Sequence, residues 1–174
     1  MPVLPEHGQL ALYSVFRHVD QLKDNTTVPV IVRNLRLQPE NQNDEDVVQV
    51  NIKGASLTLE GCTIKAEGDT EMHGAYVGAG ELTLINTEIL DFKAEQGAGV
   101  YVASGATLTV KGNRNSMSIS GNTAEQGGGI YVANGATLNV SGGSISYNKF
   151  ADEAENSAGA DIYLAGEKAV FNLN

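Results

Sequence analysis

"GAGVYVASGATLTV" (residues 97–110) and "GGGIYVANGATLNV" (residues 127–140) are two nearly identical stretches of one chain. When the comparison is extended to 94–110 and 124–140, 13 of 17 positions are identical at a spacing of 30 residues. Weaker copies start at Gly74 and Gly159, and residues 48–59 carry the same rhythm. Internal similarity at such a period is typical of repeat proteins, in which each unit packs against the next.

Apolar and polar residues alternate along three short segments of each repeat, as in 130–132, 137–140 and 144–146. A period of two indicates β-strands with one buried face. Glycines such as Gly135, Gly142 and Gly143 separate the segments and permit tight turns. The chain is therefore expected to be an all-β, right-handed parallel β-helix of about five to six coils, with three short strands per coil. A β-propeller blade would need four strands and about 40 residues per repeat.

The same alternation predicts which side chains point into the interior of the β-helix. The expected interior set runs from Val48 and Val50 in the first repeat to Ile162, Leu164, Phe171 and Leu173 in the last. Cys62, the only cysteine, falls on an inward position and is expected to be a core thiol. Asn122 and Asn148 occupy matching places after the third strand and are expected to form hydrogen bonds with turn backbone groups.

The N-terminal segment has a different period. Its apolar residues recur at helical spacing and predict an amphipathic helix that caps the first coil: Leu12, Val15, Phe16, Val19 and Leu22. Residues 1–47 are expected to hold this capping helix, a first strand and an acidic loop, and residues 48–174 the β-helix repeats, within one structural domain. The last repeat has no such cap, so its end is expected to continue into further chain or to meet a partner, for example a second copy in a homo-oligomer.

The charge of the chain limits its partners. The 174 residues carry a formal net charge of −10, which disfavours nucleic acid, because phosphate binding depends on lysine and arginine. No apolar run is long enough to span a bilayer. The N-terminus does not show the pattern of a signal peptide. The chain as written therefore suggests the cytoplasm, and an extracellular place stays open if its natural N-terminus differs.

The motif "GGGIYV…GATL.V.GGSIS.N" resembles the repeats of polymorphic outer-membrane-protein-like and other adhesin-like bacterial β-helix proteins. Gly127–Ile130 matches their Gly-Gly-Ala/Gly-Ile motif, and Asn122 and Asn148 match the asparagine of a second motif whose phenylalanine is missing here. The resemblance covers roughly residues 48–174. It implies a β-helix in an adhesin-like, bacterial or phage setting, and it says little about activity because this scaffold has many functions.

Four tyrosines recur on the first strand of successive repeats: Tyr76, Tyr101, Tyr131 and Tyr163. Because their neighbours point inward, these side chains are expected to form a row on one outer face, which we call the tyrosine ladder. The ladder either only stabilises the sheet by stacking or is a contact surface for a protein or glycan partner. Gly99 and Gly129 are expected to keep this row accessible.

The loops before the first strands are acidic, and stacking is expected to gather their carboxylates on one edge, which we call the acidic edge: Glu67, Asp69, Glu71, Glu95, Glu125, Asp152, Glu153 and Glu155. This edge is a solvated rim that favours solubility, a weak Ca²⁺ site, or a docking face for a basic partner. No Ca²⁺-loop consensus supports a metal, and no cofactor is expected.

Catalysis is not expected. A polysaccharide lyase would need a cation near the substrate and a base, and a hydrolase would need clustered carboxylates. The repeats contain one arginine, Arg114, while Glu81, Glu88 and Asp91 are dispersed, and His73 near Glu71 is expected to be solvated. A threonine face for ice, suggested by Thr107 and Thr109, is interrupted by other side chains. The sequence favours a non-enzymatic recognition module; the alternatives are an acidic cytoplasmic inhibitor, such as a phage-encoded one, and a polysaccharide-active enzyme.

Overall fold

The structure is a computed structural model that describes residues 29–39, 47–50, 54–68, 71–151 and 158–174. All regular elements in these ranges are β-strands. The expected capping helix falls in residues 1–28, outside the described residues, and therefore stays a prediction. No helix in the described part is long and apolar enough to cross a membrane.

The strands form three main parallel sheets and one short pair. Sheet 1 contains β1 (Val30–Arg33), β4 (Ser56–Glu60), β7 (Glu81–Ile85), β10 (Thr107–Lys111), β14 (Thr137–Val140) and β18 (Val170–Leu173). Sheet 2 contains β2 (Arg36–Leu37), β5 (Thr63–Lys65), β8 (Glu88–Leu90), β11 (Ser118–Ser120) and β15 (Ser144–Ile145). Sheet 3 contains β3 (Val48–Val50), β6 (Ala75–Val77), β9 (Val100–Val102), β13 (Ile130–Val132) and β17 (Ile162–Leu164). The short pair joins β12 (Thr123–Ala124) to β16 (Lys149–Phe150).

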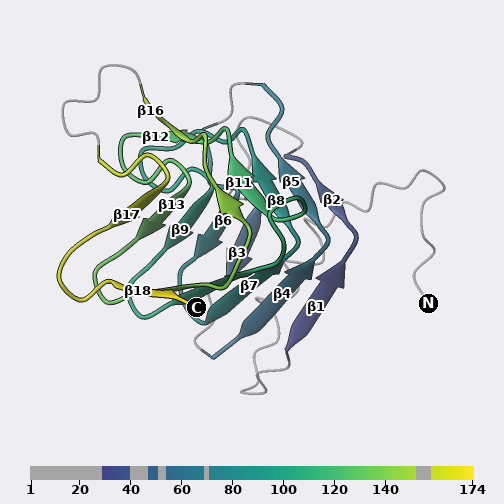
Figure 1. The fold of residues 1–174 in the computed structure, drawn as a ribbon, viewed down its shortest axis with the longest axis horizontal. Helices are drawn as coiled ribbons and strands as arrows, with labels where there is room; N and C mark the ends of the chain where they lie inside the picture. The colour runs from purple at the N-terminus through teal and green to yellow at the C-terminus, as the bar shows by residue number, and fades with distance from the viewer. Residues whose placement is uncertain (1–28, 40–46, 51–53, 69–70, 152–157) are drawn as a thin grey trace.

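The chain visits sheet 1, sheet 2 and sheet 3 in turn and then returns to sheet 1, so each strand pairs with the equivalent strand of the next coil (Figure 1). This is a parallel β-solenoid, which confirms the predicted all-β repeat fold. Both strands before residue 48 take part in it, because β1 pairs with β4 and β2 pairs with β5. The strands Val30–Arg33 and Arg36–Leu37 thus belong to the first coil of the solenoid.

The core is the apolar interior between the three sheets. Rows of identical or similar side chains run along it, for example Leu57, Leu82, Leu108 and Leu138, which the strand register places one above another. All four are buried. Removing so many branched apolar side chains from water is the main force that holds the coils together.

The corner between sheets 1 and 2 repeatedly uses left-handed backbone. Between sheets 1 and 2, positive φ angles recur at Asn34, Gly61, Asn86, Gly112 and Gly142. Only glycine adopts this region without steric cost, and asparagine tolerates it better than most residues do. The glycines that punctuate the repeats are therefore needed where the chain turns.

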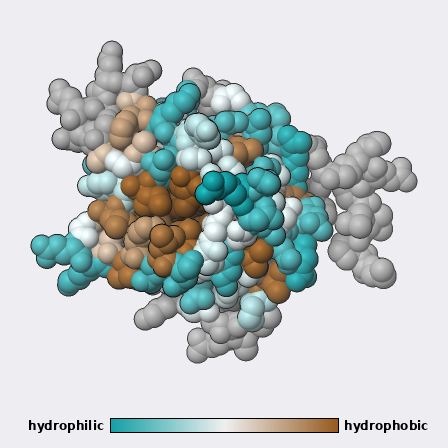
Figure 2. All heavy atoms as spheres, viewed as in Figure 1, coloured by the Kyte–Doolittle hydropathy of each residue, from teal (hydrophilic) through white to brown (hydrophobic). Residues whose placement is uncertain are grey.

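The last coil departs from the predicted core. Leu164, Phe171 and Leu173 continue inward rows of the register, yet they are 40%, 40% and 75% exposed. Within the described residues, no further strand lies beyond β17 and β18 to cover these side chains. In the view of Figure 2, brown apolar residues gather around the position of β18 in Figure 1. The predicted inward register of these three residues is confirmed, and their exposure fits the expectation that the last repeat has no cap.

Candidate functional site

The tyrosine ladder lies on the outer face of sheet 3. Strands β6, β9, β13 and β17 place Tyr76, Tyr101, Tyr131 and Tyr163 in direct register from coil to coil. In β6, β9 and β13, the residues on both sides of the tyrosine are fully buried, so the tyrosine must point outward. The predicted alignment of the four side chains is confirmed.

The rings stack on one another. The centroids of Tyr76 and Tyr101 are 5.3 Å apart with the planes 8° from parallel, and those of Tyr101 and Tyr131 are 5.0 Å apart at 9°. The Tyr131–Tyr163 pair is tilted by 32° at 5.5 Å. All four side chains are partly exposed. Tyr101 and Tyr131 each have a neighbouring ring on both sides, so each presents its edge and not its face to a partner.

His73 extends the ladder, which the sequence reasoning did not foresee. Its ring centroid lies 5.8 Å from that of Tyr76 and 5.4 Å from that of Tyr101, and its Nδ1 lies 3.0 Å from the carbonyl oxygen of Gly97. His73 is half-buried, so its interpretation as a solvated loop residue beside Glu71 was wrong. Its position three residues before Tyr76, just outside the strand, was the only available signal.

The two central phenols of the ladder hold their protons more tightly than free phenols do. Burial raises the pKa of the Tyr101 phenol above the ordinary value of 10.0, and the neighbouring Tyr76 adds to this increase. Burial likewise raises the pKa of Tyr131, with further contributions from Tyr101 and Tyr163. Ionised phenols at this spacing would repel one another, so the stack favours the protonated forms.

The glycines before the tyrosines serve backbone packing. A Cβ atom on Gly99 would overlap the carbonyl oxygen of Gly129, and one on Gly129 would overlap the carbonyl oxygen of Asp161. Both glycines are buried, so the expectation that they keep the ladder accessible was wrong. Gly97 is the glycine next to the ladder: its φ is +60°, and a Cβ there would lie 2.9 Å from the Cβ of Tyr131.

The acidic edge is only partly assembled. Glu95 and Glu125 lie on adjacent coils, since the backbone N–H of Glu125 donates to the carbonyl oxygen of Glu95 at 3.0 Å. Glu71, in contrast, is in register with Lys93, and Glu67 accepts a hydrogen bond of 2.8 Å from Gln38. The remaining members fall outside the described residues: Asp69, Asp152, Glu153 and Glu155.

A pair of glutamines lies between the carboxylates and the ladder. Gln96 and Gln126 are paired across adjacent coils, and the Nε2 of Gln96 donates to the Oε1 of Gln126 at 3.3 Å. They directly precede Gly97 and Gly127, the glycines against the tyrosines. Tyrosine, glutamine and glutamate thus lie side by side across this part of the surface.

The predicted asparagine contacts are present inside the adjoining turn. The Oδ1 of Asn122 accepts from the backbone N–H of Phe92 at 3.0 Å, and the Nδ2 of Asn122 donates to the Oδ1 of Asn148 at 3.0 Å. Asn148 in turn donates from both its backbone N–H and its Nδ2 to the Oδ1 of Asp161, at 3.1 and 3.0 Å. We call Asn122, Asn148 and Asp161 the asparagine ladder.

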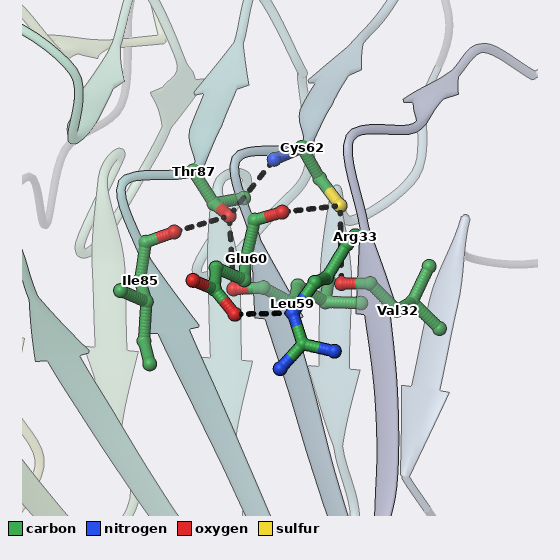
Figure 3. Close-up of polar contacts among 7 residues, drawn as sticks. All are labelled: Val32, Arg33, Leu59, Glu60, Cys62, Ile85 and Thr87. Atoms are coloured by element: carbon green, nitrogen blue, oxygen red, sulfur yellow. Dashed lines mark hydrogen bonds and ion pairs between the residues drawn. The ribbon is translucent and has the colours of Figure 1, made fainter.

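Cys62 is a buried thiol at the corner after β4, as predicted (Figure 3). Its Sγ lies 3.6 Å from the carbonyl oxygens of Val32 and Glu60, and its backbone N–H donates to the Oγ1 of Thr87 at 3.3 Å. The Arg33–Glu60 ion pair, 2.7 Å, lies outside it on the surface. These contacts belong to the core and the corner of the solenoid and give the thiol a structural role.

Glu88 and Asp91 contact different partners and do not form a cluster. Glu88 accepts from the Oγ1 of Thr63 at 3.2 Å, and Asp91 pairs with Lys65 at 3.4 Å. Among the described residues, no group of three or more histidine, cysteine, aspartate or glutamate side chains is placed to hold a metal ion.

No protein-family model, curated protein or solved structure matches this chain. The adhesin-like resemblance of the repeats therefore stays a hypothesis. The tyrosine ladder, with the glutamines and glutamates beside it, is the surface on which a functional proposal can be built.

Proposed function

We propose that this protein is a non-enzymatic, adhesin-like recognition module that binds a partner protein through the tyrosine ladder. The observation that supports the proposal is the row of aligned, partly exposed phenols, whose hydroxyls form no hydrogen bond within the described part of the chain. Tyrosine offers a large amphipathic contact at low entropic cost, and its free hydroxyl can form a hydrogen bond with a partner.

The geometry favours a protein partner over a glycan. Sugar rings bind aromatic side chains mainly by packing on the ring face, whereas the faces of Tyr101 and Tyr131 are covered by their neighbours in the stack. Ring edges and hydroxyls repeat once per coil, and such a surface suits the mixture of apolar and polar groups on a protein.

The charge beside the ladder favours a basic partner. Glu95 and Glu125 are exposed like charges on adjacent coils, and neither side chain forms an ion pair or hydrogen bond with a described residue. Like charges directly opposite one another across two strands are destabilising. A lysine or arginine of a partner would relieve this repulsion and accelerate association.

The wild-type chain serves as bait for proteins of the source organism, and each captured protein is then titrated with the wild type and with Tyr101→Ala/Tyr131→Ala. Truncation of interface tyrosines commonly costs about 1–2 kcal/mol each, so binding should weaken at least about tenfold. Thr109→Ala/Thr137→Ala, two truncations on the outer face of sheet 1, provides a control away from the ladder. Equal affinity of both double variants for every captured protein would refute the tyrosine ladder as the binding surface.

A second candidate is an acidic inhibitor that covers a basic site of another protein, which the exposed Glu95 and Glu125 favour. In that case, Glu95→Gln/Glu125→Gln should weaken binding more than the tyrosine variant does, and added salt should weaken binding of the wild type strongly. The third candidate, a polysaccharide-active enzyme, would require turnover of a uronate polymer by the purified chain.

The handedness, the number of coils and the two ends of the solenoid are also proposed. We expect the solenoid to wind in the right-handed sense that parallel crossovers almost always adopt, to comprise about five to six coils, and to be capped by an amphipathic helix within residues 1–28. The uncovered end at β18 is proposed to support self-association.

A further inference from the structure

The stacked phenols hold three oxidisable rings in fixed proximity. Tyr76, Tyr101 and Tyr131 are nearly parallel at centroid distances of 5.3 and 5.0 Å. The strand register fixes their backbones as direct neighbours. Fixed proximity of two reacting groups replaces a slow bimolecular encounter by a local one.

Phenols at this distance can react with each other after one-electron oxidation. Each phenol gives one electron to an oxidant and its hydroxyl proton to water, which leaves a phenoxyl radical with unpaired spin on the ring carbons next to the C–O carbon. Two such radicals form one C–C bond between these carbons, and the displaced ring hydrogens return to the oxygens. The product, dityrosine, has lost two hydrogen atoms in total, and the oxidant has taken up two electrons.

We infer that the tyrosine ladder is a site of oxidative modification, at which a one-electron oxidant of the peroxidase class joins Tyr101 to Tyr131 as dityrosine. This pair has the shortest centroid distance in the ladder and almost parallel rings. The Tyr131–Tyr163 pair is farther apart and tilted, which makes it the poorer couple. Partial exposure lets the oxidant and the proton-accepting water reach the phenols.

The product would be a covalent staple between two successive coils. It would close a loop of the chain between residues 101 and 131, as a disulfide does, and would restrict the unfolded state. The chain has a single cysteine and cannot form an internal disulfide. The staple does not depend on a binding partner, so it goes beyond the proposed function.

The experiment oxidises the full chain at low concentration with a photoactivated ruthenium(II) polypyridyl complex and persulfate. The starting chain carries Tyr147→Phe. Tyr131 and Tyr147 lie on the same tryptic peptide, 115–149, so this substitution leaves Tyr131 as the one tyrosine of that peptide. We expect dityrosine fluorescence, an intact mass lower by two hydrogens, and peptide 94–111 linked to 115–149. The thermal midpoint should be higher after oxidation than before it.

Two further substitutions make the result specific. Tyr101→Phe keeps a stacked ring without the phenol and should abolish the linked peptide pair, whereas Tyr163→Phe, at the tilted end of the ladder, should leave it in place. Circular dichroism confirms that each variant is folded. The inference is overturned if no dityrosine forms, if the links join different molecules or other tyrosines, or if the same pair forms equally well in urea.

Discussion

At the scale of single residues, the corners of the solenoid are most sensitive to the φ angle. One corner repeats a left-handed conformation at Asp91, Gly121 and Tyr147, with φ of 66°, 72° and 61°. Glycine is suited to this region, and a bulky residue in it is strained. Tyr147 is 85% exposed, so little packing compensates for the strain.

Tyr147→Gly is therefore expected to stabilise the protein by about 1 kcal/mol, since the relieved strain exceeds the added entropy of the unfolded chain. Urea unfolding measures the change. The matched substitution Gly121→Ala should destabilise the fold, because its Cβ would enter the left-handed region and contact Asp91. Equal effects of the two substitutions would show that φ does not govern this corner.

The asparagine ladder is the second residue-scale determinant. Asn122 is fully buried, accepts from the backbone N–H of Phe92 and donates to the carbonyl oxygen of Ile89. Asn122→Leu would leave the backbone N–H of Phe92 without its partner in an apolar interior, at a cost of about 1–3 kcal/mol. Chemical denaturation should show this loss, whereas Asn139→Leu, on the partly exposed outer face of sheet 1, should change stability by less than about 0.5 kcal/mol.

At the scale of the elements, the tyrosine ladder makes stability depend on alkaline pH. The folded state raises the pKa of Tyr101 and Tyr131 above 10.0, so the unfolded chain loses these protons first as the pH increases. Their contribution is complete below about pH 10 and is lost as the pH rises through the folded pKa values. The thermal midpoint should fall above about pH 10, and less steeply in Tyr101→Phe/Tyr131→Phe. An identical alkaline profile in that variant would contradict the coupling.

The strands and their register were predictable because the apolar alternation and the near-identity of neighbouring repeats are both visible in the sequence. Tyr101 and Tyr131 are 30 residues apart within nearly identical repeats, and the structure pairs them directly. The predicted gathering of carboxylates on one edge does not hold for Glu71, because the repeats differ in length there. Glu71 lies five residues before its tyrosine, whereas Lys93, its register partner, lies eight residues before Tyr101. Loop length between coils is set by local turns, which periodicity does not encode.

His73 and the last coil show what the alternation of apolar and polar residues cannot reveal. His73 is a loop residue, and its contact with the ladder depends on where the turn places its ring, which a strand pattern cannot reveal. The burial of Phe171 and Leu173 would require a further coil stacked on β18, although both residues carry the apolar pattern of buried strands. The alternation identifies the face of the strand on which a side chain lies, but it does not show whether another coil covers that face.

At the scale of the whole molecule, the two ends of the stack differ from its middle. In the described part of the chain, β18 pairs with β14 on one side and has no strand on the other. It also exposes Val170 and Leu173, at 43% and 75%. A sheet edge with free backbone groups and apolar side chains is a template for pairing with another chain.

This end is expected to make the protein self-associate, and Val170→Lys/Leu173→Lys should weaken that association at least about tenfold, which corresponds to about 1.4 kcal/mol. Charge on an edge strand opposes pairing, and both side chains are exposed enough for the fold to tolerate lysine. Sedimentation velocity over a concentration series measures the effect. Ile31→Lys, on the strand at the opposite end of sheet 1 and 51% exposed, is the control. A wild-type chain that stays monomeric at every concentration, or an equal effect of Ile31→Lys, would show that β18 is not the associating edge.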